Sequence, residues 1–323
     1  MSTQTTENGT TPFIDQGSSF MVHRSTYNAP DRITIAIQKS GRLADASLSL
    51  LERCGLHIAR SRDGLFGYGE SMPIDLLFVR DDDIPSFLTD GHADFGIVGR
   101  NVAEEYALAV PEQRLAYVVR RDLGFGSCRL SIAIPEAAPW EGVASLQGKR
   151  VATTYPRITR GFLAANGVDA LVVTLAGSVE LAPRLGSADA IADLVSTGRT
   201  LRANHLREVE TVVQSSAVLL QSSRDLKPEL DIVAERLLQR IDSTLRVDES
   251  KYVMLHAPAA SVDAIAELLP GAEHPSVLPL AGTADRVAVH AVCREAVLWE
   301  HLESLKEAGA SAILVLPVER MML

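Results

Sequence analysis

Short apolar runs rich in β-branched residues alternate with segments of helical periodicity along most of the chain. Residues 33–37 form one such run, which suits a buried strand. Residues 43–54 then carry leucine and alanine at helical spacing, and Gly55 follows as a helix stop. The alternation recurs, with a strand at 74–79, a helix at 84–90 and a strand at 95–98. This order predicts a mostly parallel α/β sheet covered on both faces.

A second group of alternating segments predicts a second α/β lobe. The long apolar stretch 209–220 is interpreted as a strand pair, or as a crossover that returns to the first lobe. Two α/β lobes joined by a crossover have a cleft between them, which is the default ligand site. Strands are expected at 130–134, 150–153, 170–175 and 190–194, and helices at 158–166, 179–185 and 200–204.

The carboxyl-terminal part of the chain follows a different order. A charged helix is predicted at 227–245, and it precedes a β-α-β-β-α-β pattern, the ferredoxin-like split motif. The expected fold class is α/β, with a two-lobed periplasmic-binding-protein-like core and a C-terminal ferredoxin-like (ACT-like) domain. The six elements of that domain are expected at 251–256, 261–269, 276–280, 286–292, 295–307 and 312–316.

These patterns divide the chain into consecutive parts. Residues 1–31 are rich in Ser, Thr, Gln and Asn without apolar periodicity, so we expect a disordered leader. Lobe I takes 32–128 together with a return segment at about 207–225, and lobe II takes 129–206. The linker helix and the C-terminal domain take 226–323.

Charge and cysteine content exclude several classes of protein. The 323 residues carry 31 Lys+Arg against 41 Asp+Glu, a net charge of −10. Proteins that bind nucleic acid or anionic membranes need clustered Lys and Arg, so this balance argues against both functions. Three dispersed cysteines (Cys54, Cys128 and Cys293) offer neither a disulfide framework nor a CxxC metal site, which favours a reducing cytoplasm. With no apolar run of membrane length and no signal peptide recognisable, we expect a cytoplasmic protein.

A loop of small polar residues carries the most informative chemistry. Ser196-Thr197-Gly198-Arg199-Thr200 follows a predicted strand that ends near Asp193, and a helix is expected to begin at Thr200. Such a loop offers N–H groups, hydroxyls and the positive end of a helix dipole to a phosphate. Asp193 can then bind ribose hydroxyls or Mg²⁺. The structural alternative is an N-capped helix, with Thr200 or Ser196 as the cap.

The wider segment resembles the signature of a known enzyme family. Glu180-x5-Gly186 followed by Asp193-Leu-x-Ser-Thr-Gly-x-Thr-Leu is similar to the signature of ATP phosphoribosyltransferase. The resemblance covers residues 32–323, and the C-terminal domain is typical of the long, self-sufficient form. Further matching motifs begin at Gln38, Met72, Val79, Asp94, Leu123, Glu249, Pro270 and Ser311.

The resemblance implies a reaction and a site. N1 of ATP attacks C1 of phosphoribosyl pyrophosphate and releases pyrophosphate, in the first step of histidine biosynthesis. The loop 196–200 would hold the 5-phosphate, and Glu180 and Asp193 would contact the ribose hydroxyls or Mg²⁺. In lobe I, the implied substrate-binding residues are Lys39, Gly41, Arg42, Arg80, Asp94 and Gly96.

The chemistry explains why these residue types suffice. Ribosyl transfer develops positive charge on the sugar and negative charge on the departing pyrophosphate, which Mg²⁺ and Lys or Arg stabilise. The adenine nitrogen is itself the nucleophile, so no nucleophilic side chain is required, and positioning between two lobes becomes the main catalytic device.

The C-terminal domain is implied to be regulatory. The resemblance implies that it binds histidine as a feedback inhibitor and that the chain assembles as a homo-oligomer, dimer to hexamer. His256 ends the first predicted strand of this domain, and Ser276, Ala291 and Ser311 fall near the same implied pocket. The structural alternative for His256 is a buried histidine at a strand end.

Simpler interpretations stay open for several residues. Lys39 and Arg42 can be solvated charges at the start of a helix, Arg80 can pair with the acidic residues that follow it, and Asp94 can cap a turn. For the whole chain, the alternative is a two-lobed small-molecule binding protein without catalysis. A dinucleotide-binding enzyme is disfavoured, because no G-x-G-x-x-G follows a predicted strand.

Overall fold

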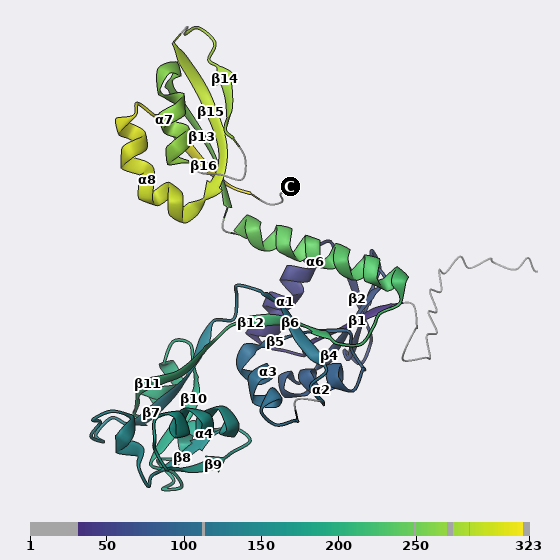
Figure 1. The fold of residues 1–323 in the computed structure, drawn as a ribbon, viewed down its shortest axis with the longest axis vertical. Helices are drawn as coiled ribbons and strands as arrows, with labels where there is room; N and C mark the ends of the chain where they lie inside the picture. The colour runs from purple at the N-terminus through teal and green to yellow at the C-terminus, as the bar shows by residue number, and fades with distance from the viewer. Residues whose placement is uncertain (1–31, 112–113, 249, 270–273, 284, 319–323) are drawn as a thin grey trace, which may run out of the picture. The chain divides into compact units, whose positions relative to one another are not determined.

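The computed structural model describes residues 32–111, 114–248, 250–269, 274–283 and 285–318 (Figure 1). The expected leader at 1–31 lies outside these residues. Three β-sheets organise the described part, one in each of lobe I, lobe II and the C-terminal domain. Among the described residues, no helix is long and apolar enough to cross a membrane.

The sheet of lobe I has seven strands in the order β2-β3-β4-β1-β5-β12-β6. Only β4, β1 and β5 run parallel, so the expectation of a mostly parallel sheet is wrong. An antiparallel β2-β3-β4 meander extends one edge and the returning β12 pairs antiparallel at the other, and neither needs a crossover helix. The strands are β1 (Ile33–Gln38), β2 (Ile58–Arg60), β3 (Phe66–Gly69), β4 (Ile74–Val79), β5 (Phe95–Gly99), β6 (Tyr117–Asp122) and β12 (Ala217–Ser222).

Helices cover both faces of this sheet, as the sequence predicts. The fully buried Ile33, Ile35 and Ile37 share an apolar cluster with leucines of α1 (Arg42–Arg53) and α6 (Pro228–Asp248). Helices α2 (Ile84–Thr89) and α3 (Arg100–Ala107) cover the other face, which Ala36 joins. The predicted linker helix is therefore also part of the lobe I core.

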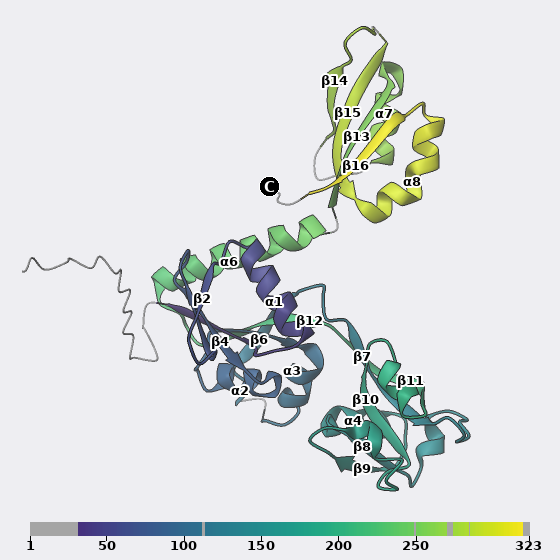
Figure 2. The same cartoon turned by 180° about the vertical axis from the view of Figure 1, so that it is seen from behind.

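The sheet of lobe II has five strands in the order β11-β7-β10-β8-β9. Strand β10 runs parallel to β8 but antiparallel to β7. Two connections link the sheets of the lobes, from β6 to β7 and from β11 to β12, so the stretch near 209–220 is a crossover (Figure 2). The elements are β7 (Cys128–Pro135), β8 (Arg150–Thr153), β9 (Leu171–Thr174), β10 (Ala190–Val195), β11 (Leu206–Ser215), α4 (Pro156–Ala165) and α5 (Arg199–Ala203).

The C-terminal domain has the predicted β-α-β-β-α-β order. Its four-stranded antiparallel sheet, β14-β15-β13-β16, buries one face beneath α7 and α8. Alternation along β13 turns Val253, Leu255 and Ala257 toward those helices. The elements are β13 (Ser250–Pro258), α7 (Val262–Leu268), β14 (Ser276–Pro279), β15 (Arg286–Arg294), α8 (Glu295–Glu307) and β16 (Ser311–Pro317).

Candidate functional site

The predicted phosphate loop lies between the end of β10 and the start of α5. Val195 and Leu201 are buried on either side and anchor it, and α5 begins at Arg199, one residue before the predicted start. Gly198 has φ 70° and ψ 8°, a left-handed conformation that other residues adopt only with strain. A Cβ at this position would also lie 3.1 Å from Nη1 of Arg202. Glycine is therefore required by the backbone itself.

The loop leaves hydrogen-bond donors available. Within the described residues, the backbone N–H groups of Ser196, Thr197 and Gly198 donate no hydrogen bond, and the side chains of Ser196 and Thr197 are exposed. These groups line an open pocket of about 420 Å³. Unpaired N–H groups and hydroxyls in a concave site suit the oxygens of a phosphate. The pocket is lined by Arg42, Asp193, Leu194, Val195, Ser196, Thr197, Gly198, Arg199, Thr200 and Leu201.

Two carboxylates lie beside this loop. Asp193 is half-buried on β10, and its Oδ1 accepts a hydrogen bond of 2.8 Å from the N–H of Leu194. Burial raises the pKa of Asp193, and the negative charge of Glu180 raises that pKa further. Glu180 comes from the 3-10 turn Val179–Leu181 and forms no ion pair within the described part of the chain. Among the described residues, no ion pair balances the negative charge of these two carboxylates.

A divalent cation fits this donor set. Mg²⁺ prefers hard oxygen ligands and commonly takes one or two protein carboxylates, completing its shell with substrate phosphates and water. Glu180 and Asp193 supply such oxygens. No group of three or more His, Cys, Asp or Glu side chains that could hold a metal ion occurs among the described residues, so the remaining ligands would come from substrate and water.

Lobe I contributes cations at one edge of its sheet. Lys39 and Arg80 follow β1 and β4, which are parallel neighbours, so both lie at the carboxyl edge. The N–H of Lys39 donates to the carbonyl oxygen of Val79 at 2.8 Å and joins the two loops. Gly41, at φ 101°, immediately precedes α1, and Arg42 reaches the pocket of the phosphate loop. The structure thus brings Arg42 together with Asp193 and the loop.

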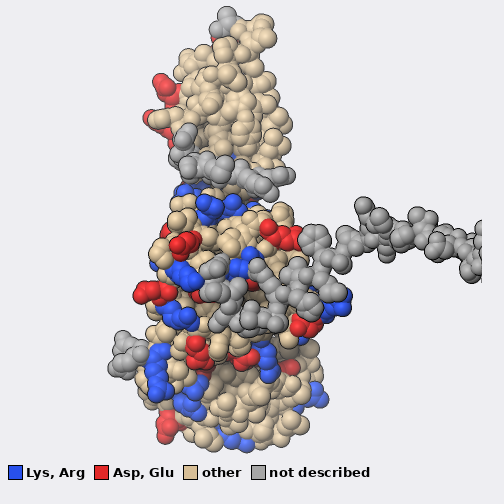
Figure 3. Space-filling view, turned by 90° about the vertical axis from the view of Figure 1, so that its right-hand side faces the viewer, with Lys and Arg blue, Asp and Glu red and all other residues tan. Residues whose placement is uncertain are grey.

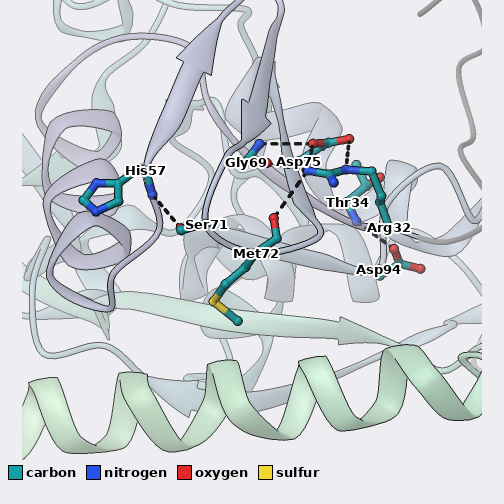
Figure 4. A network of polar contacts seen from close by, with 8 residues as sticks. All are labelled: Arg32, Thr34, His57, Gly69, Ser71, Met72, Asp75 and Asp94. Atoms are coloured by element: carbon teal, nitrogen blue, oxygen red, sulfur yellow. Dashed lines mark hydrogen bonds and ion pairs between the residues drawn. The ribbon is translucent and has the colours of Figure 1, made fainter.

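Asp94 and Gly96 lie apart from these cations. Asp94 precedes β5 and so lies at the amino edge of the parallel strands, where its Oδ2 accepts from the N–H of Thr34 at 2.8 Å (Figure 4). Gly96 is buried within β5, where a Cβ would lie 2.6 Å from Cγ2 of Ile84. Their predicted place in the substrate site is not supported by this geometry. The motif that begins at Asp94 runs along β5, so its first residues lie at the amino edge of the sheet and its last at the carboxyl edge. The sequence of the motif does not reveal this separation.

The four residues of the implied histidine pocket divide between two faces of a sheet. His256 pairs with Ser311 across β13 and β16, and Ser276 pairs with His290 on β15. Ala291 is buried in the cluster beneath the helices, whereas strand alternation turns His256 to the opposite face. The structure therefore brings His256 and Ser311 together and places Ala291 apart from them.

A polar cluster next to Asp193 was not singled out from the sequence. Ser131 lies directly opposite Asp193 in the β7–β10 pairing and is fully buried. Its Oγ donates to Oε1 of Glu208 at 2.8 Å, and the guanidinium of Arg129 makes a bidentate ion pair with the same carboxylate. This pairing lowers the pKa of Glu208. Arg129 lies within a matched motif, but only the cross-strand contacts reveal its partner.

Charged side chains elsewhere show no comparable arrangement on the face that Figure 3 presents. Lys and Arg are interspersed there with Asp and Glu rather than gathered into a patch of one sign. That distribution agrees with the net charge of −10 in giving no polyanion-binding surface on this face.

Comparison with known proteins identifies the family. The family model described as ATP phosphoribosyltransferase (HisG) matches residues 80–243, half of the chain, and the HisG C-terminal domain matches residues 248–320. The structure of the ATP phosphoribosyl transferase (HisG:HisZ) complex from Thermotoga maritima is similar, at 26% identity and a TM-score of 0.53. That match covers 65% of this chain and 98% of that chain.

A more distant likeness is to a solute-binding protein. The alkanesulfonate-binding protein SsuA from Xanthomonas axonopodis pv. citri is 19% identical with a TM-score of 0.42, over 74% of this chain and 79% of that one. The family matches and the sheets themselves confirm the α/β fold with a two-lobed core and a C-terminal ferredoxin-like domain. The chain therefore belongs to the ATP phosphoribosyltransferase family, pentosyl-transferring enzymes of histidine biosynthesis, in the long form that carries its own C-terminal domain.

Proposed function

We propose that the chain carries out the reaction of its family at the pocket beside β10. The loop 196–200 holds the 5-phosphate of phosphoribosyl pyrophosphate, and Glu180 and Asp193 contact the ribose hydroxyls or Mg²⁺. The observation that carries this assignment is that unpaired loop N–H groups and Asp193 line one pocket, with the charge of Glu180 close to Asp193. The loop supplies donors for the anionic end of the substrate, and the carboxylates attract its cation.

The cations of lobe I complete the chemistry. Arg42 lines the pocket, and Lys39 and Arg80 lie at the same edge of the lobe I sheet. Their positive charges stabilise the pyrophosphate as its bond to C1 breaks. Enzymes of this family use a divalent metal with their substrates ATP and phosphoribosyl pyrophosphate; we propose Mg²⁺, which would neutralise charge on the leaving group when bound.

The proposed reaction needs no nucleophilic side chain, because positioning of the two substrates between the lobes is sufficient. N1 of ATP attacks C1 directly, so the protein must hold two substrates in line and exclude water. The activity test is pyrophosphate release that requires ATP, phosphoribosyl pyrophosphate and Mg²⁺ together. Release without ATP, or none with all three present, would refute the assignment.

The role of the loop is tested by replacing glycines of equal backbone strain. Gly198 and Gly167 both have left-handed φ, 70° and 69°, but Gly167 follows α4 with open space around it. Alanine at either position costs on the order of 1 kcal/mol of stability. Gly198→Ala should raise KM for phosphoribosyl pyrophosphate at least about tenfold by displacing the loop donors. Gly167→Ala should leave KM unchanged, and equal effects would argue against the loop.

Feedback inhibition by histidine is typical of long-form enzymes, and we propose it for this chain. His256 and Ser311 share a place on β13 and β16, where Arg286 Nη2 donates to Ser311 Oγ at 2.7 Å. His256→Ala in the full chain should weaken inhibition by histidine, whereas His301→Ala on α8 should not. Unchanged inhibition in His256→Ala would place the ligand elsewhere.

The family's assembly into oligomers leads to a second regulatory proposal. We propose that histidine favours a compact, inactive homo-oligomer, because a ligand shifts an equilibrium toward the state that it binds more tightly. Analytical ultracentrifugation with and without histidine measures both the oligomeric state and the shift. An identical sedimentation coefficient in the two conditions, together with full inhibition, would exclude this mechanism.

A further inference from the structure

Helix α3 of lobe I is attached to the connection between β11 and β12. The N–H of Arg100 donates to the carbonyl oxygen of Ser216 at 2.9 Å, and the N–H of Asn101 donates to Oγ of Ser215 at 3.1 Å. The Ser215 hydroxyl donates in turn to Oδ1 of Asn101 at 2.7 Å, and both side chains are buried. The amino end of α3 is therefore fixed at the point where the chain passes between the two sheets.

One turn further along, α3 reaches a helix of lobe II. The carboxylate of Glu105 accepts hydrogen bonds from the backbone N–H groups of Arg157 and Ile158, each at 2.9 Å. These N–H groups belong to the first turn of α4, which Tyr155 leaves without a side-chain cap. Glu105 thus caps a helix of the other lobe, and we call this contact the Glu105 cap. Residues four apart share a helix face, so Asn101 and Glu105 project from the same side of α3.

The negative charge of Glu105 is compensated by its surroundings in the cap. The Glu105 side chain is only 13% exposed, and Nη1 of Arg157 lies 3.3 Å from the same carboxylate. A helix N-terminus carries partial positive charge and unpaired N–H groups, so a largely buried carboxylate is well compensated there. This is a stronger contact than an exposed ion pair between lobes would be.

The segment that the cap fixes lies near Asp193. Tyr155 directly precedes the capped turn, is buried, and donates its N–H to Oγ1 of Thr153 at 2.9 Å. Burial raises the pKa of Tyr155, and the nearby charges of Asp82 and Asp193 raise it further. Asp82 follows β4 of lobe I and Asp193 lies on β10 of lobe II. The Tyr155 ring thus lies near acids from both lobes.

We propose that Glu105 is a positioning residue for ribosyl transfer, setting the spacing between the two lobes through the cap on α4. The proposal rests on the assignment of substrates to the two lobes. Glu105 contacts no substrate in this scheme. It holds the Tyr155 turn, and with it the lobe that carries Asp193, against the edge of lobe I that carries Lys39 and Arg42.

The test compares Glu105→Ala with Glu105→Gln and with Glu104→Ala. Glutamine keeps an acceptor for the two N–H groups. Glu104 is the neighbouring acid on α3, and within the described residues it makes no hydrogen bond to α4. Glu105→Ala should lower kcat about tenfold, the scale of one lost helix cap, with KM for each substrate changed less than about twofold. Glu105→Gln should recover most of the loss, and Glu104→Ala should match the wild type.

Hydrogen exchange tests the cap itself, whereas the fall in kcat at nearly constant KM is the readout that a merely structural role would not move. The amides of Arg157 and Ile158 should exchange faster in Glu105→Ala than in the wild type, with Glu105→Gln between them. Loss of the cap should lower the midpoint of thermal unfolding by no more than about 4 °C. Unchanged exchange in Glu105→Ala would overturn the cap, and faster exchange with unchanged kcat would overturn its positioning role. A wild-type enzyme without pyrophosphate release would instead refute the function on which the proposal rests.

Discussion

Asp94 and Asp193 are the same side chain in two kinds of surroundings. Both are partly buried at strands of a lobe, and burial is the main reason that the pKa of each is raised. A backbone N–H lowers the pKa of each carboxyl, from Thr34 for Asp94 and from Leu194 for Asp193, and only the influences of neighbouring charges differ in sign. The charge of Arg224 lowers the pKa of Asp94, whereas the charge of Glu180 raises that of Asp193.

This difference is the basis for proposing a structural role for Asp94 and a functional role for Asp193. Near Asp94, the charged side chains at the amino edge of the lobe I sheet are already paired, since the Arg32 guanidinium donates two hydrogen bonds of 2.8 and 2.9 Å to Asp75. Near Asp193, the negative charge of Glu180 lies close to that of Asp193, and both are beside the loop 196–200 with its unpaired N–H groups. Two neighbouring carboxylates and unpaired N–H groups do not stabilise the folded state by themselves. A bound cation and a bound phosphate would compensate them.

The variant Asp193→Asn gives the strongest test of the difference between the two acids. The amide keeps the size of the side chain but loses the charge, so we expect kcat/KM to fall at least about 100-fold, the scale of one lost electrostatic contact to a transition state. Stability should stay equal or rise slightly, because the repulsion from Glu180 is removed. Steady-state kinetics and urea unfolding measure the two effects.

Asp94→Asn is the matched control for that experiment. Asparagine still offers an oxygen to the N–H of Thr34, and the position is remote from the pocket, so kcat/KM should change less than about twofold. A folded Asp193→Asn enzyme with wild-type kinetics, or an equal loss in Asp94→Asn, would erase the distinction between the two sites.

The phosphate loop could be predicted because its chemistry is local. Five consecutive residues after a strand contain the hydroxyls, the N–H groups and the glycine that the turn requires. The strand directions in lobe I are predicted less well, since most of its strand pairs are antiparallel. The pattern of strand and helix cannot distinguish a parallel neighbour from the antiparallel β12, because both are equally apolar and buried.

The Glu105 cap lies beyond sequence-based reasoning for a different reason. Its acceptor and the N–H groups of Arg157 and Ile158 are 52 and 53 residues apart. Every residue except proline has a backbone N–H, so no residue type marks the donors. Asp94 illustrates the converse limit, since a motif that matches as a whole does not show which of its residues lie at the carboxyl edge of the sheet.

A second prediction concerns the closed edge of lobe I. Asp75→Asn removes the charge that balances the Arg32 guanidinium, where the two side chains are 19% and 17% exposed. We expect a loss of about 2 kcal/mol in the free energy of unfolding, between the values for exposed and fully buried pairs, with kcat preserved. Asp189→Asn removes a charge from the more exposed pair with Arg150 and should cost less. Equal costs would show that burial does not strengthen the Arg32 pair.

The smallest expected effect is the pH dependence of Asp94. Because its folded-state pKa lies above the unfolded value, the native state binds more protons between the two values, and the stability of the wild type falls as pH rises through that window. Asp94→Asn lacks the titration, so it should equal or exceed the wild type near neutral pH, by at most about 1 kcal/mol, and lose that advantage in acid. Urea unfolding of both proteins across the acidic range measures the difference. A wild type that instead gains stability relative to Asp94→Asn as pH rises would mean that Thr34 and Arg224 outweigh burial, and Asp94 would then be a fully compensated acid.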